Sequence, residues 1–106
     1  MNVIREVKSD RVGDRYYEVK HPSGLRIFVY PKEQNNSTYA VFGTRYGSVD
    51  TTFKRSDESE ACTVPAGIAH YLEHKLFESE DGDAFARYAK TGANANAYTS
   101  FDVTCY

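Results

Sequence analysis

The chain has 106 residues, of which 41% are hydrophobic and 26% are charged, and its formal net charge is −2. These values are ordinary for a globular domain, and the slightly acidic balance argues against binding to nucleic acid or to an anionic membrane. No apolar stretch approaches the roughly 20 residues of a membrane span, and the N-terminus lacks the apolar core of a signal peptide. We therefore expect one small cytoplasmic domain.

Three segments in the first half of the chain are rich in β-forming residues. Residues 15–20 and 25–30 flank the turn-forming residues 21–24, and this arrangement predicts a β-hairpin. Residues 38–46 predict a third strand, which a Gly-Ser pair ends. His21 precedes Pro, Ser and Gly, so it fits a turn better than it fits a metal site.

A polar, charged stretch over residues 50–61 predicts an exposed loop that leads into a helix. Thr63 and Pro65 provide the capping side chain and the early proline that are typical of a helix start. Three apolar residues recur at helical spacing and predict the buried side of this helix: Ile68, Leu72 and Leu76.

Residues 83–90 predict a second helix, with Asp83 as its N-cap and Gly92 as its stop. Strand character follows over residues 97–99 and 103–106, without a closing turn or polar tail. The fold class we expect is α+β, with an antiparallel or mixed sheet and helices packed on one face. We also expect the chain to be a fragment, truncated after the second helix and the strand that follows it.

The most informative motif lies on the first predicted helix, where His70, Glu73 and His74 form the pattern H-x-x-E-H. Residues at i and i+4 project from one helical face with their Cβ atoms about 6 Å apart, which suits two nitrogen ligands on one zinc ion. Glu73 borders that face and could accept a proton from water during metal-assisted hydrolysis. The alternative is an ordinary amphipathic helix with two surface histidines and a solvated glutamate.

A third ligand is not evident within the sequence. Catalytic zinc normally takes three protein ligands, and Glu78 shares the histidine face at i+8. Eight residues of helix span about 12 Å, too far for one ion to be bound across them. Cys62 and Cys105 do not form a C-x-x-C pair, so we expect two free thiols in a reducing compartment.

The stretch from Gly67 to Phe77 resembles the zinc-site helix of the M16 (insulinase or pitrilysin) peptidase family. Residues 92–100 resemble the family's glycine-then-Asn-Ala-x-Thr strand, and Gly47-Ser48 stands where the family has a glycine-serine turn. The similarity is strong from Val64 onward, weaker before it, and nearest to the small bacterial YmfH-like branch. It implies that residues 1–106 are the N-terminal portion of a single M16-type peptidase domain.

This resemblance implies a role for each residue of the motif. His70 and His74 would bind Zn²⁺, and Glu73 would be the catalytic base that accepts a proton from the attacking water. The third ligand would be a glutamate on a later helix beyond Tyr106, so the 106-residue fragment itself would be inactive.

The resemblance also implies residues that contact the substrate. Asn96 and Ala97 match the positions on an edge strand that holds the backbone of an extended peptide. Phe77 matches a position near the site. The alternatives are a strand-end asparagine with no ligand and a buried packing aromatic.

The leading functional hypothesis is a zinc-dependent metallopeptidase that hydrolyses peptides or small proteins. The alternative is a non-catalytic M16-like subunit, or a peptide-binding module, that assists an active partner. The intact H-x-x-E-H motif favours the active half. The expected partners are a peptide substrate and the remainder of the M16 protein or a homologous second half, with no nucleic acid and no membrane.

Overall fold

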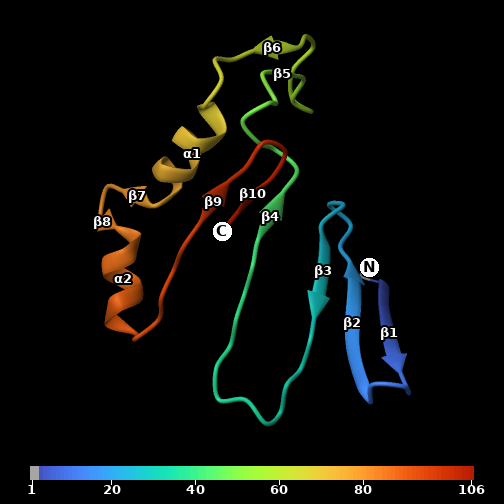
Figure 1. Ribbon diagram of the computed structural model, residues 1–106. Helices are drawn as coiled ribbons and strands as arrows, with labels where there is room; N and C mark the ends of the chain where they lie inside the picture. Colours follow the sequence, from blue (N-terminus) through green and yellow to red (C-terminus); the bar gives the residue numbers. More distant parts are fainter. Residues whose placement is uncertain (1–2) are drawn as a thin grey trace. The chain divides into compact units, whose positions relative to one another are not determined.

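The computed structural model describes residues 3–106 and is α+β, with two short helices and small antiparallel sheets (Figure 1). The α+β class is confirmed, although the strands are divided among separate small sheets. Two compact units make up the chain, Met1–Tyr39 and Ala40–Tyr106. Within residues 3–106, no helix combines the length and the apolar character that a membrane crossing requires.

The first unit is a three-stranded antiparallel sheet in the order β1-β2-β3, built from β1 (Val3–Ser9), β2 (Asp14–Lys20) and β3 (Arg26–Val29). The predicted hairpin is confirmed as β2 and β3. Strand β1 was missed, although Ile4 lies opposite Val19 across the sheet. Its β-branched residues were the available signal.

A buried carboxylate organises the middle strand of this sheet. Glu18 is only 6% exposed, and its two oxygens lie 2.9 Å from Arg5 and 2.8 Å from Arg26. The hydrogen bond from Arg26 is the main reason that the pKa of Glu18 lies below its ordinary value, and the charge of Arg5 adds to it. Because a buried charge is costly unless it is paired, these arginines make the position tolerable for a carboxylate.

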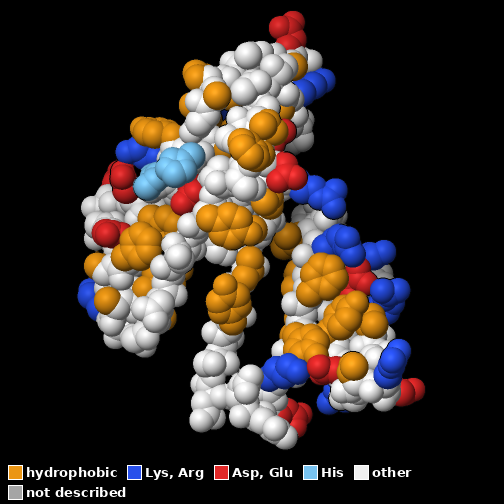
Figure 2. Space-filling model, viewed as in Figure 1, with side chains coloured by type: hydrophobic (Ala, Val, Ile, Leu, Met, Phe, Trp, Pro, Cys, Tyr) orange, Lys and Arg blue, Asp and Glu red, His pale blue; other side chains and the backbone are white. Residues whose placement is uncertain are grey.

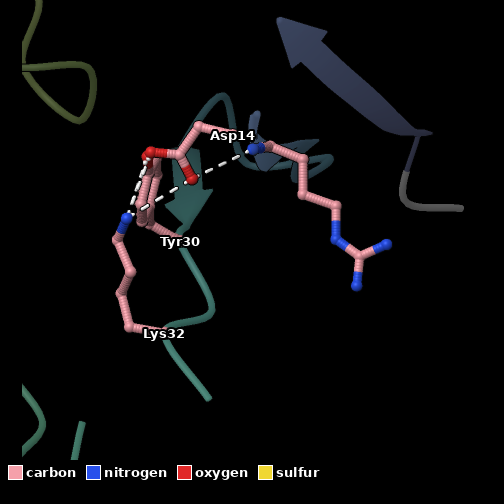
Figure 3. Close-up of polar contacts among 4 residues, drawn as sticks. Asp14, Tyr30 and Lys32 are labelled. Carbon is pink, nitrogen blue, oxygen red and sulfur yellow. Dashed lines mark hydrogen bonds and ion pairs between the residues drawn. The ribbon is translucent and has the colours of Figure 1, made fainter. Parts of the chain in front are cut away.

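A polar cluster connects the start of β2 to the segment after β3 (Figure 3). The Lys32 ammonium lies 3.1 and 3.3 Å from the two oxygens of Asp14 and donates to the Tyr30 hydroxyl at 3.3 Å. The same ammonium lies 4.3 Å from the centroid of the Tyr30 ring, in the geometry of a cation–π contact. These side chains are largely exposed, so the cluster contributes only modestly to stability.

The ion pairs of Glu18 with Arg5 and Arg26 predict that part of the stability of this sheet is lost in acid. The pKa of Glu18 in the folded state lies below the ordinary value of 4.5. The ionised carboxylate therefore stabilises the folded protein above about pH 4.5, and this stabilisation is lost as the pH falls through the lowered pKa. Glu18→Gln should therefore lose less stability than wild type between pH 7 and about pH 3. Amide exchange in β1, β2 and β3 measures this loss.

The matched control for this prediction is Glu6→Gln, because the ion pairs of Glu6 are longer, at 3.5 and 3.9 Å. This control should keep the acid response of the wild type. An unchanged acid response in Glu18→Gln would contradict the proposed origin of the pKa shift.

The second unit holds both helices and the remaining strands. In chain order these elements are β4 (Gly43–Thr44), β5 (Thr52–Phe53), β6 (Cys62–Thr63), α1 (Ile68–Leu76), β7 (Glu78–Ser79), β8 (Gly82–Asp83), α2 (Ala84–Lys90), β9 (Tyr98–Thr99) and β10 (Thr104–Cys105). Strand β10 lies between β4 and β9, whereas β5 pairs with β6 and β7 pairs with β8 (Figure 1).

The third predicted strand is mostly absent. Of residues 38–46, only Gly43 and Thr44 form a strand, which pairs with β10. The pairing continues through reciprocal backbone hydrogen bonds of 2.8 and 2.9 Å between Phe42 and Tyr106. Upstream, Tyr39 is 92% exposed. The predicted loop over residues 50–61 contains β5, which the polar composition concealed.

The predicted helix boundaries are correct at α2 and partly wrong at α1. Asp83 is the N-cap of α2 and accepts the Phe85 backbone N–H at 2.9 Å, and Gly92 follows the helix with a left-handed φ of 72°. Helix α1 begins at Ile68, and its N-cap is Gly67 at φ 94° instead of Thr63. No side chain caps α1, because its N-cap residue is a glycine, and a 3.4 Å hydrogen bond from the Ile68 N–H to the Pro65 carbonyl closes the turn before the helix.

The buried side of α1 also differs from the prediction. Leu72 is 43% exposed and Leu76 is 60% exposed, whereas Ala69 is 3% and Glu73 is 8% exposed. The helix packs against β9 and β10 through this Ala-Glu side. A small residue allows the close approach of a strand, and the carboxylate has a hydrogen-bonding partner there.

A glycine fixes the turn that leads from β4 into the rest of the unit. Gly47 is buried, and its N–H donates to Asp50 Oδ2 at 2.8 Å. The following backbone N–H groups of Ser48 and Val49 each donate at 3.0 Å to the carbonyls of residues 100 and 101. A Cβ atom at position 47 would lie 2.4 Å from the Phe101 carbonyl carbon, so only glycine fits without a shift of the backbone.

Gly47→Ala should therefore destabilise the protein by about 1–3 kcal/mol, as expected for overpacking against a fixed backbone. Urea unfolding measures the change. Gly43→Ala is the matched control, because its added Cβ would meet only Cys105 Sγ at an ordinary 3.5 Å. This control should cost less than about 1 kcal/mol. Equal stability of the two variants would contradict the close approach.

Candidate metal centre

Helix α1 brings the two histidines of the motif together. His70 and His74 are both exposed, their ring centroids are 4.7 Å apart, and their Nε2 atoms are 2.9 Å apart. Figure 2 shows the two imidazoles as one patch at the surface. Two nitrogens bound to one tetrahedral ion at about 2.0–2.1 Å would lie about 3.3–3.4 Å apart, so the pair needs to open by only a few tenths of an ångström to fill two positions of a zinc site.

In the described part of the chain, the pair provides two donors of a metal site. Among residues 3–106, no group of three or more His, Cys, Asp or Glu side chains is placed to hold a metal ion. Glu78 pairs with Lys75 at 2.8 Å, and this partner lowers the pKa of the Glu78 carboxyl. Cys62 and Cys105 are free thiols, as predicted. The donor set therefore supplies two ligands.

Glu73 lies one residue from His74 but faces the inside of the unit. Its carboxylate is buried, and its Oε2 atom accepts a hydrogen bond from the hydroxyl of Thr99 on β9. The histidines are thus exposed on one side of α1, whereas the carboxylate is held on the adjoining side. Sequence reasoning missed Thr99 as the partner of Glu73, because 26 residues separate the two in the chain.

The phenol of Tyr106 is affected by the buried carboxylate of Glu73. Burial raises the pKa of the Tyr106 phenol, and the negative charge of Glu73 raises it further. The ring of Tyr106 also lies 6.1 Å from Phe77 and 6.5 Å from Phe42. The sequence motif indicated only that Tyr106 belongs to the final strand block.

Asn96 and Ala97 lie immediately before β9, which is an edge strand of the β4-β10-β9 sheet. The Asn96 side chain accepts the Ala97 backbone N–H at 2.9 Å, so it shapes the local backbone. The edge position is compatible with peptide binding, and the role of these two residues in holding a substrate stays a prediction.

Phe77 is the C-cap of α1 and packs toward the second helix. Its ring stacks on Phe85 of α2 with centroids 4.7 Å apart and an interplanar angle of 19°. This contact gives Phe77 a packing role, and its position near a bound substrate stays a prediction.

Comparison with known proteins identifies the family. Residues 59–106 match the family model described as Insulinase (Peptidase family M16). The chain is also 47% identical over 104 residues to a Bacillus subtilis (strain 168) protein named "Uncharacterized zinc protease YmfH". No solved structure matches the chain. The chain belongs to peptidase family M16.

The match covers 98% of this chain and 24% of the Bacillus relative, so the chain spans about a quarter of the length of that protein. Family membership therefore applies to these 106 residues. The activity, substrate and partners of a whole protein that contains them are matters for proposal.

Proposed function

We propose that this chain is the N-terminal, zinc-binding part of a zinc-dependent metallopeptidase that hydrolyses peptides or small proteins. The observation that carries the proposal is the convergence of the His70 and His74 Nε2 atoms at 2.9 Å, with the Glu73 carboxylate held on the adjoining side of the same helix. The name of the Bacillus relative, a zinc protease, supports the choice of metal.

His70 and His74 would hold the zinc, together with a ligand from outside this chain. When bound, zinc polarises a carbonyl and lowers the pKa of water. Glu73 accepts the proton of the attacking water and delivers it to the leaving amine. The burial of Glu73 keeps bulk water from competing for its carboxylate oxygens.

The remaining residues of the site would bind and enclose the substrate. An extended peptide can add to the edge of a sheet through main-chain hydrogen bonds, and β9, preceded by Asn96 and Ala97, offers such an edge. Phe77 would line the same region. We further propose that the chain is part of a single M16-type α+β domain, which a second half or subunit joins to enclose the peptide.

Zinc content tests the ligand assignment. The full-length protein should contain about one zinc ion per chain. His70→Ala or His74→Ala should remove most of this zinc, because the two ligands that remain hold the ion poorly. Elemental analysis of untagged protein measures the content. His21→Ala is the control, since His21 bonds Ser23 in a turn at 2.7 Å. Equal zinc in all four proteins would refute the assignment.

Substitution of the base tests the chemistry. Glu73→Gln in the full-length protein should keep zinc and lower kcat by about 100-fold or more, because the amide preserves shape but cannot accept the proton. A quenched fluorescent peptide reports turnover. Glu78→Gln, just beyond the helix in β7, should retain the activity of the wild type. Turnover by Glu73→Gln within a few-fold of wild type would exclude Glu73 as the base.

A further inference from the structure

We propose that Thr99 is a positioning residue that holds Glu73 in its reactive orientation, an inference that rests on the proposed function. The hydroxyl of Thr99 donates to Oε2 of Glu73. This hydrogen bond engages one carboxylate oxygen, so proton acceptance falls to Oε1. In this role the Thr99 hydroxyl acts through Glu73, whereas a peptide at the β9 edge would be held by main-chain hydrogen bonds.

The need for such a partner follows from the side chain of glutamate. A glutamate has several rotatable bonds, and a base that samples many rotamers spends little time at the reacting proton. Glu73 lies on the packed side of α1, where it is 8% exposed. A carboxylate at that depth needs a hydrogen-bond donor, and the Thr99 hydroxyl supplies one from the neighbouring strand.

Backbone pairing of β9 with β10 holds Thr99 in place. Thr99 lies directly opposite Thr104 in the β9–β10 pair, and the turn between them is closed by a 2.8 Å hydrogen bond from the Ser100 N–H to the Val103 carbonyl. Thr104 is 1% exposed, and its hydroxyl donates to the Tyr46 carbonyl at 2.7 Å. A β-branched residue at position 99 also restricts the rotation that aims the hydroxyl.

Thr99 and Thr104 therefore form a matched pair for an experiment. They face each other across one strand pair, but the Thr99 hydroxyl bonds a side-chain carboxylate whereas the Thr104 hydroxyl bonds a main-chain carbonyl. Replacing either threonine by valine removes a hydroxyl and keeps the shape and the β propensity of the residue. Only the loss at position 99 should affect the chemistry.

The test compares Thr99→Val, Thr99→Ser and Thr104→Val in the zinc-containing full-length protein. Thr99→Val should lower kcat by about 10- to 100-fold while KM and zinc content stay within about twofold of wild type, because it removes orientation and not binding. Thr99→Ser keeps the donor and should restore kcat to within about fivefold. Thr104→Val should lower Tm but leave kcat of the folded protein unchanged.

A second measurement does not depend on activity. Thr99→Val should lower Tm when residue 73 is glutamate and should have a much smaller effect in a Glu73→Met background, where no acceptor remains. If Thr99→Val lowers Tm more with Glu73 than with Met at position 73, the difference measures the Thr99–Glu73 hydrogen bond.

The outcomes separate this inference from the proposed function. A wild-type protein without zinc-dependent turnover would refute the proposed function and, with it, the positioning role. A wild type with turnover that Thr99→Val fully retains would overturn the positioning role alone. If Thr104→Val lowers kcat as much as Thr99→Val does, the role of Thr99 is structural and the inference is wrong. If Thr99→Val lowers Tm equally in the wild-type and Glu73→Met backgrounds, the hydrogen bond on which the inference depends does not contribute to stability, and the inference is also contradicted.

Discussion

The hydrogen bond between Thr99 and Glu73 is the interaction on which the arrangement of the site depends. Helix α1 has nine residues, and an isolated helix shorter than about 12–15 residues is marginal in water. It must therefore be held by packing, and its buried side consists of Ala69 and Glu73. The residue assigned to proton transfer is thus also one that docks the helix, which couples the stability of the unit to the geometry of the site.

This docking also sets the rotation of α1 about its own axis. Each residue advances about 100° around a helix, so turning positions 69 and 73 toward β9 and β10 leaves positions 70 and 74 on an adjoining, exposed face. The imidazoles can then converge at the surface while the carboxylate stays inside. The histidine spacing alone permits metal binding, but the burial of Glu73 is what fixes where that face points.

The local features of this molecule were predictable from sequence, and the non-local ones were not. The H-x-x-E-H spacing, the cap at Asp83 and the hairpin around residues 21–24 depend on neighbours in the chain. The buried side of α1 was predicted wrongly because periodicity detects apolar residues such as Leu72 and Leu76. The structure instead buries a carboxylate whose partner is 26 residues away.

Two further features depended on partners that no local pattern reveals. Gly47 was expected only to end a strand, whereas its lack of a side chain allows the Phe101 backbone to approach. Strand β1 forms because it pairs with β2 along its whole length, from Val3 opposite Lys20 to Ser9 opposite Asp14. The family resemblance pointed to candidate residues for the site, but it did not indicate how the fold orients them.

Zinc-edge X-ray absorption of the full-length protein tests the central claim most directly, because it reports the atoms bound to the metal. The account predicts nitrogen and oxygen neighbours at about 2.0–2.1 Å with the scattering pattern of two imidazoles, and loss of that pattern when His70 and His74 are both replaced. Sulfur neighbours at about 2.3 Å would instead point to cysteine ligands. That result, or an imidazole pattern that survives the double replacement, would contradict the account.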